Sequence, residues 1–116
     1  MATSNLTHEF SNLVRDVRKR YVGKGPEQVT TRFVGPWAVC ELRGNLTSVE
    51  KFIYRSSDGK RMIMDTRTTF IKEIYEDPEL RQEFENLVGA KLVTLFVDFD
   101  VERDIGMTVY VFDRSL

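Results

Sequence analysis

The 116-residue sequence has few of the residues that build most metal and nucleophilic centres. It contains one cysteine, Cys40, and one histidine, His8. A single cysteine excludes an internal disulfide and fits a reducing compartment. A zinc site would need more cysteine and histidine than the chain contains. We therefore expect Cys40 to pack as a small hydrophobic residue and His8 to be a solvated helix residue.

Long apolar runs and an excess of one charge are also missing. No run approaches the roughly 18 residues that a membrane span needs, and residues 1–10 lack the basic and apolar parts of a signal peptide. The formal net charge of −1 argues against a nucleic-acid binder, which normally carries a basic excess. No glycine-rich phosphate loop precedes a helix, and we expect no cofactor. The expected location is the cytoplasm.

The strongest pattern in the chain lies at residues 91–112, where two β-prone runs flank a charged link that contains glycine. Alternating β-branched and aromatic residues in both runs predict an antiparallel hairpin. Both of its faces are partly apolar, and we expect one face to carry Phe96, Tyr110 and Phe112 together. A strand pair that is apolar on both sides needs cover on both sides. We therefore predict a homodimer that uses this aromatic face or a sheet edge.

Periodicity and turn residues organise the rest of the chain. Residues 5–22 place apolar side chains three and four apart and predict an amphipathic helix, which ends at Gly-Lys-Gly-Pro in residues 23–26. Residues 29–42 alternate around a Gly-Pro break and predict a second hairpin. Residues 77–89 begin with Asp-Pro, end with glycine and predict another helix.

A capping box marks the start of a helix in the middle of the chain. Thr47 can accept a hydrogen bond from the amide of Glu50, whose side chain can reach back to the amide of Thr47. The helix should therefore begin at Ser48. Its spacing predicts three buried residues: Val49, Phe52 and Ile53.

The segment after this helix admits two interpretations. Asp58-Gly59 between apolar residues would suit a hairpin turn. Apolar spacing also suits a helix from Lys60 to Glu76, with Gly59 closing the helix before it. We favour the helix, because the capping box already starts a helix just upstream. The expected fold is α+β, with two antiparallel hairpins in a sheet of about four strands, helices mainly on one face, and the order α-β-β-α-α-α-β-β.

Acidic residues recur at every second position near the end of the last hairpin: Asp98, Asp100, Glu102 and Asp104. In an extended strand all four would point the same way, and carboxylate oxygens suit Ca²⁺ or Mg²⁺. For a calcium loop, however, Arg103 stands where glycine is needed and Val109 where the closing glutamate belongs. The incomplete set favours the alternative, a solvated hairpin end whose carboxylates accept from nearby amides. We expect no metal.

Basic residues surround the end of the first predicted helix: Arg15, Arg18, Lys19, Arg20, Lys24 and Arg32. Such a group suits an acidic protein partner or a small anion such as bicarbonate, a phosphate or a nucleotide. A solvated helix face with salt bridges accounts for the same residues without any ligand.

Several short motifs, in their order and spacing, resemble one family. They are Gly23-Lys24-Gly25-Pro26, Gly44-Asn45-Leu46-Thr47 with Glu50-Lys51, Leu87-Val88-Gly89-Ala90-Lys91, and the run from Leu95 through Asp104-Ile105 to Phe112. Over about residues 6–113 the chain resembles the MpsC family, named for a Na⁺-translocating, membrane-potential-generating system of bacteria. Ser48 departs from the proline often found at its position, and Met107 departs from the small or β-branched residues expected at its position.

The resemblance implies one MpsC-like α+β domain over residues 1–116. It also implies a soluble protein associated with a bacterial membrane system for cation translocation, membrane-potential generation or inorganic-carbon uptake. The family offers no established catalytic motif to transfer. We therefore expect a non-enzymatic accessory or regulatory protein that contacts a protein partner such as a membrane transport complex. The alternative is a sensor of a small ligand or anion.

Overall fold

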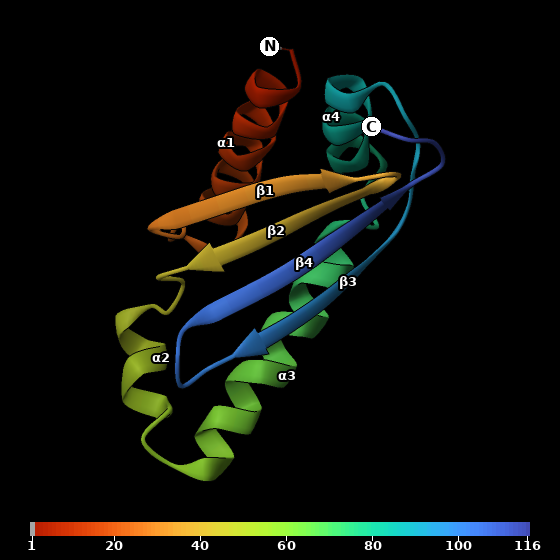
Figure 1. Cartoon of the computed structure of the whole chain (residues 1–116). Coiled ribbons are helices and arrows are strands. Elements are labelled where there is room, and N and C mark those ends of the chain that lie inside the picture. The colour runs from red at the N-terminus through yellow and green to blue at the C-terminus, as the bar shows by residue number, and fades with distance from the viewer. Residues whose placement is uncertain (1) are drawn as a thin grey trace.

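The computed structural model describes residues 2–116. Within them the chain forms four helices and four strands (Figure 1), which confirms the predicted α+β fold and its element order. The elements are α1 (Ala2–Val22), β1 (Gln28–Val34), β2 (Trp37–Arg43), α2 (Ser48–Ile53), α3 (Ser57–Ile74), α4 (Pro78–Val88), β3 (Leu92–Asp100) and β4 (Ile105–Phe112).

The four strands form one antiparallel sheet with the order β1-β2-β4-β3. Each hairpin pairs strands that are neighbours in the sequence, and β2 and β4 join the two hairpins side by side. The edges of the sheet are therefore β1 and β3. A bulge between Leu92 and Thr94 interrupts β3, and bulges of this kind are common in edge strands.

The main core lies between one face of the sheet and the helices α1, α3 and α4 (Figure 1). Phe10, Val14 and Val17 follow the spacing of three and four residues that places side chains on one face of α1, and all three are fully buried. The Phe10 ring packs edge-on against Phe84 of α4 and Tyr110 of β4, with centroids 5.2 Å apart in both pairs. Among the described residues, this arrangement leaves the opposite face of the sheet without a helix.

Local capping signals set the starts of the helices after the first hairpin. Both bonds of the predicted capping box at Thr47 are present, and Asp77 caps α4, which ends at Gly89 with a φ of 73°. Ser56 caps α3 by accepting a hydrogen bond from the amide of Gly59 at 2.9 Å. The ambiguous segment is therefore a helix. Gly59 lies in its first turn and does not close α2, so the predicted role of Gly59 is wrong.

The predicted burial of α2 is also wrong. Val49 and Phe52 are each 68% exposed, and no residue of this six-residue helix is fully buried. The helix lies beyond the end of the sheet (Figure 1), so its apolar side has no sheet to cover it. The guanidinium of Arg55 lies over the Phe52 ring, 5.0 Å from its centroid. Only Ile53 packs partly, against a small cluster that contains Ile63.

Candidate functional site

The face of the sheet that carries no helix is the first candidate site, and we call it the open face. The cross-strand register arranges its residues in four rows that run across all the strands. Two adjacent rows are mainly apolar: Val34, Trp37, Val111 and Thr94, followed by Arg32, Val39, Val109 and Phe96. The next two rows are mainly polar: Thr30, Glu41, Met107 and Asp98, followed by Gln28, Arg43, Ile105 and Asp100.

The apolar rows of the open face are accessible to solvent. Phe96 is 61% exposed, Val34 52% and Trp37 46%. Contiguous exposed apolar surface on a folded chain marks an interaction site, and Trp and Phe supply much of the contact area at protein interfaces. The open face therefore has the composition of a binding surface, with an apolar part bordered by polar rows.

The predicted grouping of Phe96 with Tyr110 and Phe112 on one face is wrong. The register pairs Phe96 with Val109 and pairs Tyr110 with Leu95. Tyr110 is completely buried and Phe112 is 2% exposed, both in the core under the helices. Because side chains alternate along a strand, a shift of one residue between two strands moves a whole set to the opposite face. Of the three aromatic residues, only Phe96 belongs to the open face.

The basic residues near the end of α1 do not form one surface. Arg18 is buried, whereas Lys19 and Arg20 are exposed on the helix. Arg20 forms an ion pair with Glu83 of α4 at 3.0 Å, and its pKa is raised chiefly by that hydrogen bond. Arg32 lies on the open face, on the other side of the sheet from α1. The other two predicted contact residues, Arg15 and Lys24, bind backbone carbonyls of the following turn and of the loop after β2.

The acidic residues around the β3–β4 turn bind separate partners. The carboxylate of Asp100 accepts from the guanidinium of Arg103 at 3.0 Å, and Glu102 pairs with Lys60 of α3 at 2.6 Å. Asp98 lies on the open face and accepts from the next backbone amide. Within residues 2–116, no three histidine, cysteine or acidic side chains gather in a way that could hold a metal ion.

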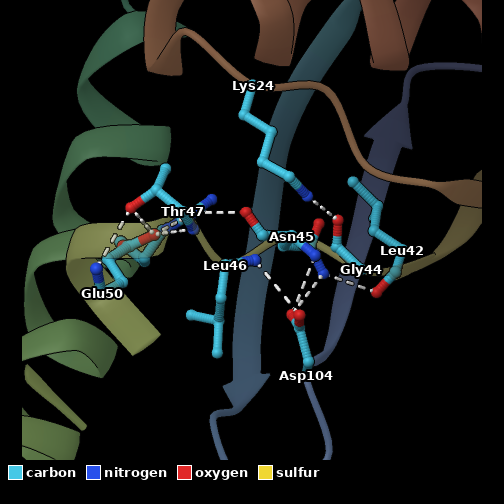
Figure 2. Close-up of polar contacts among 9 residues, drawn as sticks. Lys24, Leu42, Gly44, Asn45, Leu46, Thr47, Glu50 and Asp104 are labelled. Carbon is cyan, nitrogen blue, oxygen red and sulfur yellow. Dashed lines mark hydrogen bonds and ion pairs between the residues drawn. The ribbon is translucent and has the colours of Figure 1, made fainter. Parts of the chain in front are cut away.

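The fourth acidic residue, Asp104, joins the two hairpins. Its carboxylate accepts from the backbone amides of Asn45 at 2.9 Å and Leu46 at 3.2 Å, as Figure 2 shows. Its φ of 53° is left-handed, a region that aspartate enters more readily than most residues. From the other side, the Lys24 ammonium donates to the carbonyl of Gly44 at 2.7 Å. The Gly-Asn-Leu-Thr segment is thus a structural junction, a role that spacing alone did not reveal.

A buried ion pair between Glu50 of α2 and Arg67 of α3 completes this junction. The side chains are 19% and 8% exposed, and they meet at 2.5 Å and 2.8 Å. Arg67 also donates to the carbonyl of Asn45 at 2.7 Å. Burial alone would raise the pKa of Glu50, but the hydrogen bonds from Arg67 and Thr47 outweigh it and lower the pKa. Glu50 is therefore ionised at neutral pH and fastens α2 to α3.

A second candidate site surrounds Arg18, which is only 5% exposed and lies between α1 and the sheet. Its Nη2 donates to the hydroxyl of Thr108 at 3.3 Å. In the part of the chain that the structure describes, its Nε has no hydrogen-bond partner, and the same holds for Oδ1 of Asn45. Both residues line a cavity of about 10 Å³, together with Arg67, Asp98 and Thr108. A buried guanidinium without a carboxylate is costly, so this cavity suits a polar occupant.

Cys40 and two tyrosines are buried polar groups of the core. The Cys40 sulfur lies 3.4 Å from the hydroxyl of Thr31, which shares a hydrogen bond with Ser11 at 2.7 Å. The hydroxyls of Tyr75 and Tyr110 bond to each other at 2.7 Å. Burial raises the pKa of the Cys40 thiol to about 12 and raises the pKa of both tyrosines. All three groups are therefore protonated at neutral pH.

We predict that Cys40 in the folded protein does not react with an aromatic disulfide reagent at pH 8. The thiolate is the reactive form, and a pKa of about 12 leaves only about one thiol in 10,000 ionised at that pH. Absorbance of the released aromatic thiol measures the reaction, with complete reaction expected in guanidinium. A Ser115→Cys variant, whose new thiol lies at an exposed position, should release one equivalent promptly without denaturant. Equal rates for the two thiols would contradict the prediction.

Over residues 2–116 the structure is that of a small α+β protein whose four-stranded sheet is covered by helices on one side only. The chain belongs to the MpsC family: the family described as "Na+-translocating membrane potential-generating system (MpsC)" matches residues 2–114. The chain is similar to the "Uncharacterized protein YrhF" of Bacillus subtilis (strain 168), at 42% identity over 113 residues that cover 97% of this chain and 92% of that protein. No solved structure matches the chain. Across residues 2–116, none of the helices combines the length and apolar character needed to cross a membrane.

Proposed function

We propose that this chain is a non-enzymatic accessory or regulatory protein that works in the cytoplasm through contact with other proteins. The observation that carries the proposal is the open face, on which two apolar rows cross all four strands without a helix over them. Membership of the MpsC family supports an association with the membrane-potential-generating system after which the family is named.

Phe96 and Trp37 are the anchors that such a contact would use. Both side chains are exposed by about half or more, and each lies in an apolar row. Burying apolar surface contributes about 25 cal/mol per Å², and aromatic residues near the centre of an interface carry a large share of the binding energy. The polar rows beside them would form the solvated rim of the contact.

Co-purification from native cells with a tagged chain tests this function, followed by identification of the recovered proteins. Phe96→Ser removes a ring from the open face, and Phe52→Ser is the matched control because it removes a ring of similar exposure from α2. We expect Phe96→Ser to lower the recovery of subunits of an ion-translocating membrane system at least tenfold, and Phe52→Ser to leave it unchanged. Equal recovery with both variants would remove the open face from the proposal.

The basic end of α1 offers an alternative contact for the same partner. Lys19 is exposed there, and Lys24 lies on the adjoining turn. A Lys19→Glu and Lys24→Glu double variant should leave recovery within about twofold if the open face is the contact. Loss of the partner from this variant, together with normal recovery by Phe96→Ser, would place the contact at the basic end instead.

A second candidate function, recognition of a small anion, is favoured by Arg18. Its guanidinium lacks a carboxylate partner among the described residues, whereas the charge of Arg67 is already balanced by Glu50. The adjacent cavity of about 10 Å³ is close to the minimum that one water molecule needs. A compact monovalent anion fits this space better than a phosphate or a nucleotide. Asp98 also lines the cavity, but its exposed side chain belongs to the open face on the other side of the sheet.

Thermal unfolding in sodium chloride, bicarbonate and nitrate at one ionic strength tests the anion function. A ligand present at 100 times its dissociation constant adds about 2.7 kcal/mol to stability. An anion-specific rise in Tm is expected for the wild type and for Arg61→Met, a control at an exposed arginine of α3. No such rise is expected for Arg18→Met. Equal responses of all three proteins would reject the anion and leave the cavity to water.

A further inference from the structure

We propose that a second copy of this chain covers the open face, related to the first by a two-fold axis that runs parallel to the strands between β2 and β4. The inference rests on the proposed function, because it adds a second copy of the chain as an occupant of the same contact surface. It replaces the predicted aromatic dimer face, two of whose three rings are buried under the helices.

The strand order makes the open face complementary to itself about this axis. The rotation places β1 over β3 of the second copy and β2 over β4, while each row stays opposite the same row. Packed sheets keep their strand directions within about 30°, so the rows remain roughly aligned. Trp37 then lies opposite Val111 of the second copy, and Val39 lies opposite Val109. The apolar rows therefore bury each other.

In the same arrangement, opposite charges of the two copies lie near each other at both edges of the sheet. Arg32 on β1 lies opposite Phe96 of the second copy and one row from Asp98. A guanidinium over an aromatic ring is favourable, and a neighbouring carboxylate adds to the attraction. Within the described single chain the Arg32 side chain has no hydrogen bond or ion pair, and the Asp98 carboxylate accepts only from the amide of Phe99. Two-fold symmetry repeats these contacts at both edges.

The other two-fold axis in the plane of the open face, perpendicular to the strands, is disfavoured. It would exchange the apolar and polar rows, placing Glu41 on Val39 of the second copy and Asp98 on Phe96. Burying carboxylates against apolar side chains costs several kcal/mol when no donor is near. With the axis parallel to the strands, no two like charges in the four rows lie directly opposite each other.

The size of the open face places this dimer among weak assemblies. Four strands about 4.8 Å apart, each with about seven residues at 3.3 Å, give a footprint of roughly 440 Å² per copy, or about 900 Å² for both. Specific interfaces below about 1,200 Å² are typical of weak or transient complexes. We therefore expect a monomer–dimer equilibrium with a micromolar dissociation constant, and dissociation on dilution.

Sedimentation equilibrium of the whole chain between 1 and 500 µM measures the dissociation constant of the dimer. The test reverses the charges of Arg32 and Asp98, first singly and then together. Arg32→Glu and Asp98→Lys should each raise the dissociation constant at least tenfold, because each places like charges together at both edges. The double variant restores opposite charges and should return the constant to within about threefold of the wild type. Arg61→Glu is the control, since it changes the net charge as Arg32→Glu does but lies on α3. It should not affect the equilibrium.

Three results would overturn the inference. They are a wild-type mass of one chain at 500 µM, a dimer that Arg32→Glu and Phe96→Ser both leave intact, and equal weakening by Arg32→Glu and Arg61→Glu. The second result would place the dimer at a sheet edge. A monomeric wild type that loses its membrane partner on Phe96→Ser would overturn only the dimer. A dimer that behaves as expected but recovers no other protein would overturn the accessory role and leave the dimer standing.

Discussion

Replacing Arg67 with methionine is expected to lower the free energy of unfolding by about 3 kcal/mol, because it removes one partner of a buried ion pair. The variant leaves the Glu50 carboxylate, only 19% exposed, without its guanidinium. It also leaves the carbonyl of Asn45 without the donor that Arg67 supplies at 2.7 Å. Urea unfolding followed by circular dichroism measures the loss. A change below about 0.5 kcal/mol would show that the pair contributes no net stability.

The double variant Arg67→Met with Glu50→Gln separates the loss of attraction from the penalty of an isolated charge. Glutamine keeps the amide oxygen that the capping box needs, but it carries no charge that must be compensated. We expect the double variant to regain about 1–2 kcal/mol relative to Arg67→Met alone. If the double variant is as unstable as the sum of its single variants, the two side chains act independently.

The ion pair between Glu50 and Arg67 also determines the direction in which stability changes with pH. The pKa of Glu50 is lowered in the folded state, so its contribution is present above the ordinary glutamate pKa of about 4.3 and is lost as the pH falls through the lower, folded value. Wild-type stability should therefore decline more steeply below pH 4 than that of the Arg67→Met and Glu50→Gln double variant. Parallel pH profiles of the two proteins would contradict this assignment.

The order of the elements was predictable because each boundary carries a local signal. The capping box at Thr47, the Asp-Pro start at Asp77 and the left-handed glycine at Gly89 all act within one turn of the chain. The two hairpins are likewise local, since each joins strands that are neighbours in the sequence. These features need no knowledge of the tertiary structure, and the sequence alone predicts them.

To assign the side chains of the last hairpin to the two faces of the sheet, one must know the pairing register of β3 and β4. No short sequence motif specifies this register. Alternation within each strand was predicted, but the phase between strands depends on the pairing of Asp100 with Ile105 across the turn. The bulge after Leu92 adds a further residue, so Leu92 and Leu95 both reach the core although they are three apart. A shift of one residue in the register therefore decides whether helices cover Phe96 or whether it lies on the open face.

The buried cations were missed because a charged residue on a helix normally faces water. Arg18 lies one position after the buried Val17, so only the tertiary structure shows that the sheet covers it as well. Arg67 follows the spacing of Ile63 and Ile71 along α3, and this pattern was available in the sequence. A cation at an i+4 position between two core residues is a signal for a buried partner on another element.

The second large effect on stability is expected at Gly59, which lies in the first turn of α3. Gly59→Ala is expected to destabilise the protein by about 2–3 kcal/mol, although alanine in a helix normally stabilises relative to glycine by up to about 1 kcal/mol. A Cβ at this position would overlap the backbone oxygen of Ile53 and would lie 2.8 Å from its carbonyl carbon. Backbone atoms cannot rotate away as a side chain does, so the α2–α3 junction must open.

Gly106→Ala is the matched control, because a Cβ there would meet its nearest atom, in the ring of Phe99, at an ordinary 3.5 Å. We expect this variant to remain within about 0.5 kcal/mol of the wild type. Urea unfolding of both variants gives the comparison, and hydrogen exchange locates the loss. For Gly59→Ala, amides of α2 and of the first turn of α3 should lose protection before those of the sheet, since the clash lies between the two helices. A Gly59→Ala protein as stable as Gly106→Ala would mean that the junction accepts a methyl group. In that case close packing would not explain why glycine stands inside this helix.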